Sequence, residues 1–169
     1  MQITNNNLSN FFSFGDYTIR RIKGNDIYKV VDIINEAYSY QDKTIGEPRA
    51  SAEYLLKVLL DTDFYVVEHD TEIIACFYIQ PKNKSLNFGL LAVIPSYRGK
   101  GLVMEIIKAI ESFARINKFD AIELEYTNIS PWLKKYYEGY GFNETGKLKT
   151  WGPIELIGMK KVVGDESGK

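Results

Sequence analysis

Residues 93–102, with the sequence VIPSYRGKGL, constrain the fold of this chain more than any other stretch. An apolar run stops at Pro95, passes Gly99 and Gly101, and enters a segment whose apolar residues have helical spacing. This order predicts a strand, a tight loop and a helix start. Glycines let backbone amides approach a ligand, and a helix start offers unpaired N–H groups and a positive dipole end. The stretch therefore predicts an anion site, suited to a pyrophosphate; the alternative is a turn that needs glycine only for its geometry.

The charge balance and the scarcity of metal ligands exclude several classes of function. With 21 Lys and Arg against 22 Asp and Glu, the net charge is −1, so we expect no nucleic-acid partner. Cys76 and His69 are the single cysteine and histidine. They allow no intramolecular disulfide and no cysteine-ligated metal site, so we expect no metal. His69 lies in a polar segment that predicts a solvated turn between two strands.

The hydropathy pattern predicts a cytoplasmic protein that does not bind membranes. No segment approaches the roughly 18 apolar residues of a membrane span, and residues 1–10 lack the basic start and apolar middle of a signal peptide. A length of 169 residues suits one domain with a sizeable core. We expect this domain over residues 13–163, with tails over residues 1–12 and 164–169.

Apolar periodicity divides the domain into alternating strands and helices. Strands are predicted over residues 17–22, 64–68, 72–79, 86–93, 121–126, 148–151 and 154–161. Helices are predicted over residues 26–37, 51–60, 102–117 and 130–141, capped at Asn25 or Asp26, at Ser51 and at Ser130. Residues 38–50 show no periodicity and predict an irregular loop. The pattern is typical of an α/β (α+β) domain.

Two motifs in this order resemble those of the GNAT superfamily of N-acetyltransferases. The segment Arg98–Val103 is similar to the family's Q/R-x-x-G-x-G/A signature, in which Arg98 and Gly101 match and Val103 departs. Residues 133–142 are similar to A-x-x-L-Y-E-K-x-G-F, with Leu133 and Tyr136 as departures. The resemblance covers nearly the whole domain. It implies a mixed central sheet of about seven strands with flanking helices and a splayed parallel pair that forms a CoA cleft.

The same resemblance implies that acetyl-CoA is the cosubstrate and assigns residues to it. Backbone groups at the end of strand 86–93 would bind pantetheine, and those of the following loop would bind pyrophosphate. The cofactor-binding residues implied are Leu91, Ala92, Val93, Arg98, Gly99, Lys100, Gly101, Leu102, Val103 and Ser130. Val103 either crowds the phosphates or faces the sheet, and its helical spacing favours the sheet. Ser130 stands where the family often has a pantetheine-binding asparagine, or it only caps the helix.

The resemblance also implies a catalytic residue. Tyr137 aligns with the tyrosine that the family uses as general acid toward the departing thiolate, whereas Tyr136 falls on a packing position. The alternative is that both are packed aromatics. A general base is not assigned, because the family's glutamate is absent from residues 87–90. Glu123 and Glu125 are the available carboxylates, and they read equally well as a solvent-facing pair.

The favoured function is therefore transfer of an acetyl group from acetyl-CoA to a primary amine in a ternary complex. The alternative is a CoA-binding sensor or regulatory module without turnover, and a nucleotide-binding protein ranks third because no complete phosphate-loop motif is present. We expect the acceptor to contact residues 38–49 and the hairpin near Trp151. Its identity, the use of another acyl group, and the choice between monomer and homodimer stay open.

Overall fold

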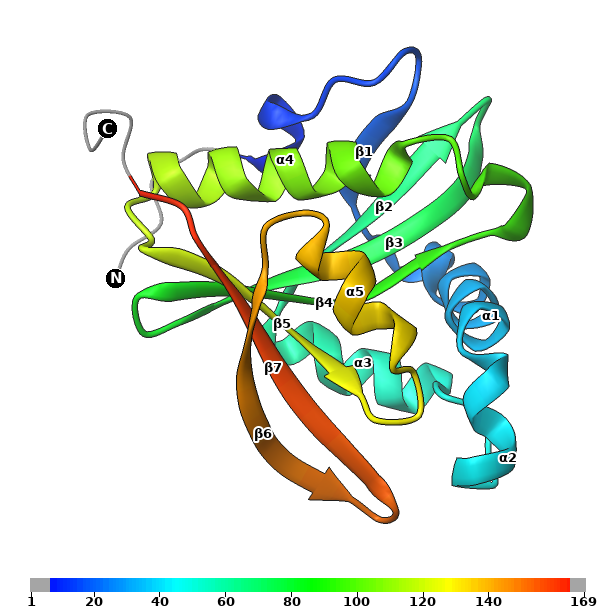
Figure 1. Ribbon diagram of the computed structural model, residues 1–169. Coiled ribbons are helices and arrows are strands. Elements are labelled where there is room, and N and C mark those ends of the chain that lie inside the picture. Colours follow the sequence, from blue (N-terminus) through cyan, green and yellow to red (C-terminus); the bar gives the residue numbers. More distant parts are fainter. Residues whose placement is uncertain (1–6, 165–169) are drawn as a thin grey trace.

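One mixed sheet of seven strands, in the order β1-β2-β3-β4-β5-β7-β6, organises the computed structural model, which describes residues 7–164 (Figure 1). The strands are β1 (Thr18–Arg21), β2 (Asp63–His69), β3 (Glu72–Lys82), β4 (Ser85–Val93), β5 (Ala121–Thr127), β6 (Asn143–Trp151) and β7 (Ile154–Val162). All neighbouring strands are antiparallel except β4 and β5, which run parallel. The predicted fold class and sheet are confirmed.

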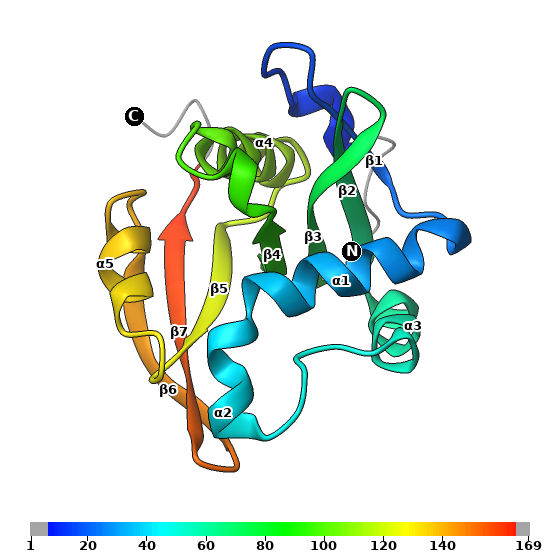
Figure 2. The ribbon, with the colours of Figure 1, turned by 90° about the vertical axis from the view of Figure 1, so that its right-hand side faces the viewer.

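Helices cover both faces of this sheet (Figure 2). The α-helices are α1 (Ile27–Ala37), α2 (Asp42–Ile45), α3 (Ala52–Asp61), α4 (Leu102–Ile116) and α5 (Trp132–Glu138). The short 3₁₀ helices are η1 (Leu8–Phe11), η2 (Gly24–Asp26), η3 (Ser39–Gln41) and η4 (Pro95–Tyr97). Helices α1 and α3 lie on one face, and α4 lies on the other. None of the described helices has the length and apolar character needed to cross a membrane.

The core consists of two apolar layers, one on each face of the sheet. Ile106, Ile110 and Phe113 of α4 are buried in the first layer, while Val30 of α1 and Leu55 of α3 are buried in the second. Strands in the middle of the sheet are therefore covered on both faces, and five consecutive residues from Ile73 are buried in β3. Burial of these two apolar layers stabilises the sheet from both faces. The ends of its strands are then available for a functional site.

The parallel pair β4–β5 separates along its length. Its register contains only Ser85↔Ala121, Leu86↔Ile122 and Asn87↔Glu123. Beyond Asn87 the pairing of β4 with β3 shifts opposite Cys76–Tyr78, and Leu90 has a left-handed φ of +48°. A bulge of this kind bends the strand that carries it. The C-terminal halves of β4 and β5 therefore diverge, which confirms the predicted splayed pair.

The structure differs from the sequence-based elements in three places. Residues 38–50, expected as an irregular loop, contain η3 and α2. The strand expected over residues 72–79 continues to Lys82, and Pro81 pairs with Leu86. Proline is tolerated where its missing N–H is not needed by the ladder. β6 begins at Asn143 rather than Leu148, since long-range pairing with β7 extends a strand that has little alternation of its own.

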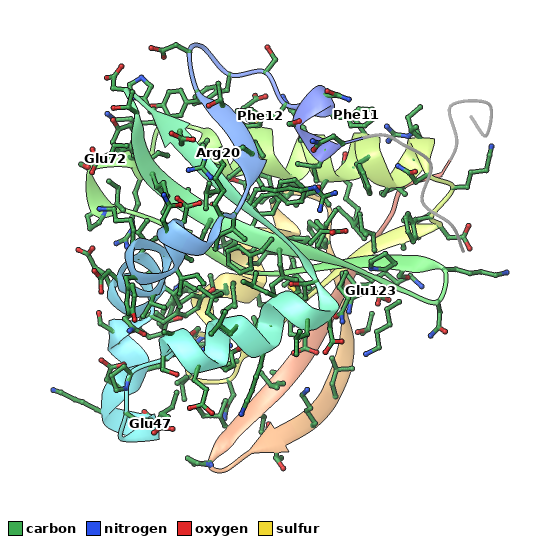
Figure 3. The ribbon with its side chains drawn as sticks, turned by 180° about the vertical axis from the view of Figure 1, so that it is seen from behind. Phe11, Phe12, Arg20, Glu47, Glu72 and Glu123 are labelled. Carbon is green, nitrogen blue, oxygen red and sulfur yellow. The ribbon has the colours of Figure 1, made fainter. Side chains whose placement is uncertain are left out.

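The described part of the expected N-terminal tail is folded. Leu8 is 0% exposed and lies in the core layer under α4. Phe11 stands edge-on to Phe113 with 6.2 Å between ring centroids, and Figure 3 shows it on the short segment beside α4. The tail expected over residues 1–12 is therefore wrong from Leu8 onward. The apolar side chains of Leu8, Phe11 and Phe12 pack in or against the core layer, and this burial outweighs the polar composition around them. Residues 1–6 and 165–169 lie outside the described part.

His69 is not the solvated turn residue that the sequence predicts. Its ring stacks on Tyr17 at 4.2 Å and forms hydrogen bonds with the Tyr97 hydroxyl at 2.8 Å and with Asp16 at 2.9 Å. The ligand atoms of Asp16, His69 and Asp70 lie within 4.8 Å of one another. Exposed acidic groups commonly gather in this way without an ion, so the absence of a metal stays a prediction.

Replacing Leu8 by alanine tests whether this segment belongs to the domain. We expect Leu8→Ala to lower the free energy of unfolding by about 2–5 kcal/mol, because the side chain is fully buried. Leu60→Ala is the control, since Leu60 is 82% exposed, and it should change stability by less than about 0.5 kcal/mol. Urea denaturation measures both. Equal stabilities would show that residues 8–11 are not packed in solution.

Candidate active site

Two cavities meet where β4 and β5 diverge. The larger, of about 660 Å³, lies over the sheet and is here called the sheet cavity. The smaller, of about 640 Å³, borders the loop before α4 and is here called the loop cavity. Both are lined by Tyr38, Tyr40, Leu133 and Tyr137. These four side chains form a shared wall, so a molecule in one cavity lies next to a molecule in the other.

The loop cavity collects most of the residues that the sequence assigns to acetyl-CoA. Of the predicted site residues, its lining includes Leu91, Ala92, Val93, Arg98, Gly99, Gly101, Leu102, Val103 and Tyr137. The end of β4 supplies the first three, the loop and the start of α4 supply the next five, and α5 supplies Tyr137. Lys100 and Ser130 are not in this lining.

The loop before α4 has the geometry of an anion cradle. Gly99 and Gly101 have left-handed φ angles of +75° and +86°, and no heavy atom lies within 4 Å of the position that a Cβ would take at either residue. Helix α4 begins directly after Gly101 without a side-chain cap, so the N–H groups of its first turn lack partners within the helix. The open space and the free amides fit a phosphate group. The predicted order of strand, glycine loop and helix is confirmed, and binding of an anion by this loop stays a prediction.

Three other predicted site residues in the loop and the first turn of α4 make contacts within the protein. The Nε of Arg98 donates a hydrogen bond to the Val93 carbonyl at 2.9 Å, which ties the loop to the end of β4. The Val103 side chain packs against the core layer between α4 and the sheet and also lines the loop cavity, so whether it crowds the phosphates stays a prediction. The ammonium of Lys100 lies 5.1 Å from the centre of the Tyr97 ring, so this side chain braces the loop from outside the cavity.

Ser130 does not take the capping role that the sequence predicts. It is fully buried, and its hydroxyl donates a hydrogen bond to the Tyr40 hydroxyl at 2.8 Å. The N-cap of α5 is Pro131 and has no side-chain cap bond, so the predicted capping by Ser130 is wrong. Its assignment to pantetheine stays a prediction. In the structure Ser130 acts through Tyr40, which it fixes in the shared wall.

Tyr137 lies at the junction of the two cavities. It extends from α5, and its ring packs edge-on against Phe142 at 5.8 Å. Burial raises the pKa of its phenol well above the ordinary value, and the neighbouring Tyr38 and Tyr136 add to the increase. The hydroxyl therefore stays protonated at neutral pH and is a hydrogen-bond donor toward either cavity. Tyr136 also lines the loop cavity, so it is not the purely packing residue that its position predicts.

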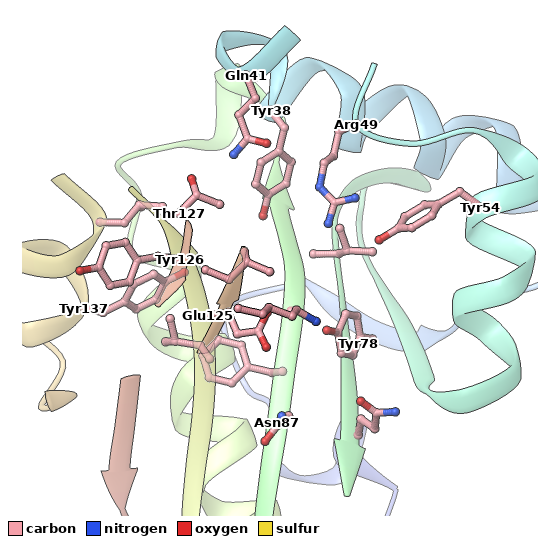
Figure 4. A pocket seen from close by; sticks show the side chains of 18 of the residues that line it. Tyr38, Gln41, Arg49, Tyr54, Tyr78, Asn87, Glu125, Tyr126, Thr127 and Tyr137 are labelled. Atoms are coloured by element: carbon pink, nitrogen blue, oxygen red, sulfur yellow. The ribbon is translucent and has the colours of Figure 1, made fainter. Parts of the chain in front are cut away.

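The sheet cavity is walled by residues from distant parts of the chain (Figure 4). Tyr38 descends from the end of α1, and its hydroxyl donates to the Leu91 carbonyl at 3.2 Å. Arg49 and Tyr54 come from the segment around the start of α3. Residues 38–49 were expected to contact the acceptor, and Tyr38, Tyr40, Gln41 and Arg49 do line this cavity. The hairpin near Trp151, the other expected contact, contributes Lys149, Thr150 and Leu156 to the lining, while the side chain of Trp151 itself lies outside the described part.

The structure distinguishes Glu123 from Glu125, which the sequence left as equivalent candidate bases. Glu125 lines the sheet cavity, whereas Glu123 is absent from the described linings. Glu123 pairs with Asn87 at the last paired position of the parallel strands. Glu125 lies two residues further along β5, beyond the point where the strands diverge. Because side chains alternate along a strand, both share one face. Only Glu125 reaches the space between the diverging strands β4 and β5.

Tyr78 and Gly89 form a close pair that sequence reasoning missed. They face each other in the β3–β4 register, and a Cβ at Gly89 would lie 2.5 Å from the Tyr78 hydroxyl oxygen. The ring therefore lies across the bare backbone of β4 and enters the sheet cavity. Burial raises the pKa of Tyr78 to about 12, and the charge of nearby Glu125 contributes. A glycine in an apolar strand was the available signal, but only the register shows which side chain fills its space.

Comparisons with known proteins agree with this geometry. Residues 61–144 match the family model described as an acetyltransferase (GNAT) domain. This match spans the strands β2 to β5, the loop, α4 and α5. No curated protein matches the chain.

Solved structures show the same fold at low sequence identity. The ribosomal-protein-S18-alanine N-acetyltransferase from Escherichia coli has a TM-score of 0.70 and 16% identity, over 88% of this chain and 94% of that chain. Ard1 from Thermoplasma volcanium has a TM-score of 0.71 and 19% identity, over 88% and 99%. Spermidine N-acetyltransferase from Vibrio cholerae, solved in complex with CoA and spermine, has a TM-score of 0.67 and 19% identity, over 88% and 96%.

A double-mutant cycle tests the contact between Gly89 and Tyr78. We expect Gly89→Ala to destabilise the wild-type protein, because the new methyl group must displace the Tyr78 ring. In a Tyr78→Leu background the same change should cost less, with a coupling of about 0.5–3 kcal/mol. Gly24→Ala is the control, since no heavy atom lies within 4 Å of its Cβ position. Chemical denaturation gives the four stabilities, and strictly additive effects would contradict the contact.

Proposed function

The chain belongs to the GNAT acetyltransferase family through the domain at residues 61–144, and on this premise we propose that it transfers acetyl from acetyl-CoA to a primary amine. The observation that carries the proposal is the shared wall. Tyr137 lines both the loop cavity, which has an anion cradle, and the sheet cavity, which has a carboxylate. Two cavities that meet at one proton donor suit two substrates bound at the same time, with direct transfer between them.

In this proposal the loop cavity holds acetyl-CoA. The amides of Gly99, Gly101 and the first turn of α4 bind its pyrophosphate, and backbone groups at the end of β4 bind the pantetheine arm as an added strand would. Acetyl-CoA supplies the thioester whose carbonyl carbon accepts the amine. The glycine cradle supports this assignment, because the open space in front of Gly99 and Gly101 is where a side chain at either position would stand.

Tyr137 serves as the general acid. The amine nitrogen forms the new C–N bond while the C–S bond breaks, and the sulfur leaves with the bonding electron pair. Tyr137 donates a hydrogen bond and then its proton to this sulfur. Its raised pKa keeps the phenol protonated before the step. A free thiol has a pKa of about 8.5, so the hydrogen bond to the developing thiolate supplies much of the stabilisation.

Glu125 serves as the general base. The attacking amine must be neutral, and it loses a second proton after the C–N bond forms. The Glu125 carboxylate lines the sheet cavity and accepts a proton from the nitrogen, directly or through one water. Glu125 passes its proton to the cavity solvent, and Tyr137 recovers its proton from the same solvent. The net proton transfer runs from the amine to the thiol, so the products are an N-acetyl amine and CoA.

Release of free CoA thiol in the presence of amines tests the proposed function, and Tyr137→Phe tests the acid. We expect transfer in the wild type and a decrease in kcat of about 10²-fold in the variant, with acetyl-CoA affinity by calorimetry little changed. Tyr28→Phe is the control, because Tyr28 is 76% exposed, and it should turn over normally. Acetyl-CoA binding without any transfer would instead support a CoA-binding module. Unchanged turnover in Tyr137→Phe would assign proton delivery to water.

Glu125→Gln tests the base, with Glu123→Gln as its matched control on the same strand face. We expect Glu125→Gln to lower kcat/KM at neutral pH by about 10²-fold and Glu123→Gln to have little effect. In Glu125→Gln the rate should keep rising with pH toward the amine's own pKa of about 10, because only amine that is already neutral reacts. A pH–rate profile from pH 6 to 10 measures this. A pH profile identical to that of the wild type would exclude Glu125 as the base.

A further inference from the structure

The sheet cavity carries an excess of positive charge. Of its described lining residues, Arg49, Lys82 and Lys149 are cationic, and Glu125 is the single carboxylate. The chain as a whole has a net charge of −1, so this local excess is not a property of the whole surface. Charges that line a concave site act on a ligand more strongly than charges on an open surface. The cavity therefore favours a molecule that carries negative charge.

Arg49 is held in a fixed position. Its guanidinium lies 5.1 Å from the centre of the Tyr54 ring and 5.9 Å from that of Tyr38. The next residue, Ala50, is joined to Asn35 of α1 by two hydrogen bonds, at 2.8 Å through its N–H and at 3.0 Å through its carbonyl. The backbone beside Arg49 is thus attached to α1. A planar guanidinium matches the geometry of a carboxylate or a similar oxyanion.

The position of Arg49 relative to the junction limits the size of the acceptor. Arg49 and Tyr137 line the same cavity, whose volume is about 660 Å³. This volume bounds the size of a molecule that reaches both side chains. An acceptor that places its amine at Tyr137 and an anionic group at Arg49 is a small molecule.

Two unpartnered oxygen atoms lie in the same cavity lining. Gln41 is 3% exposed and its Oε1 has no hydrogen-bond partner, and the Oδ1 of Asn87 is buried without a partner. Both residues line the sheet cavity. Buried oxygens of this kind are normally satisfied, so each offers an unused acceptor to a donor group of a ligand. The cavity thus offers acceptor atoms to an amine and a guanidinium to an anion.

We propose that the acceptor is a small primary amine that also carries a carboxylate or a similar oxyanion, bound by Arg49 while its amine faces Glu125 and Tyr137. This inference rests on the proposed function and adds the substrate class. A polyamine is disfavoured, because its further ammonium groups would lie beside Arg49, Lys82 and Lys149 instead of an anionic partner.

Three amines with the same five-carbon chain test the substrate class. 5-Aminopentanoate carries a terminal carboxylate, pentylamine a methyl group, and 1,5-diaminopentane a second ammonium. We expect kcat/KM for 5-aminopentanoate to exceed the other two by about tenfold or more, since a hydrogen-bonded ion pair favours it. Release of free CoA thiol measures transfer. A thermal shift of the protein by each amine, in the presence of CoA, measures binding without turnover.

Arg49→Gln should abolish both the kinetic preference and the thermal shift by 5-aminopentanoate. Arg21→Gln is the matched control, because Arg21 also stacks on a tyrosine, 5.3 Å from the Tyr65 ring centre, but lies outside the described linings of both cavities. It should keep the preference. Transfer to pentylamine or 1,5-diaminopentane at an equal or higher rate would overturn this inference alone. No transfer to any amine, with CoA bound, would overturn the proposed function and this inference with it.

Discussion

The divergence of β4 from β5 is the constraint on which the rest of the site depends. Three register pairs join the two strands, and the bulge with a left-handed Leu90 then turns β4 away. Backbone groups of β4 that face β5 beyond this point lose their ladder partners and must find others, while the pairing with β3 continues. Tyr38 satisfies the Leu91 carbonyl from outside the sheet. The same divergence opens the space into which Glu125 and Tyr78 project, so one local break in a sheet creates both cavities.

Aromatic contacts hold the two sides of this gap at a fixed separation. Tyr40 on η3 packs against Trp132 of α5 at 5.3 Å and accepts the hydrogen bond from the buried Ser130. Residues 90 positions apart in the chain thereby form one wall. Tyr38 lies 6.4 Å from Tyr40 and continues this wall toward β4. Strands that have separated cannot hold each other through a ladder, so the helices on either side of the gap fix its width instead.

The loop before α4 was predictable from sequence because its determinants are local. Two glycines, a preceding apolar strand and a following helical period specify the cradle without any distant contact. Glu125, Tyr78 and Ser130 were not distinguishable in this way. Glu125 differs from Glu123 only in its position relative to the strand divergence, and Tyr78 meets Gly89 only through strand register. Properties that depend on which residues become neighbours after folding leave no periodic signal in a single sequence.

An open anion cradle also needs support that does not fill it. The space in front of Gly99 and Gly101 is empty, so the loop gains its rigidity from contacts on its other sides. Arg98 bonds back to β4, and Lys100 lies over the Tyr97 ring, whose hydroxyl is held by His69 at the end of β2. The lone histidine, which the sequence suggested was solvated, belongs to this support. These side-chain contacts thus keep the loop amides in position for a ligand.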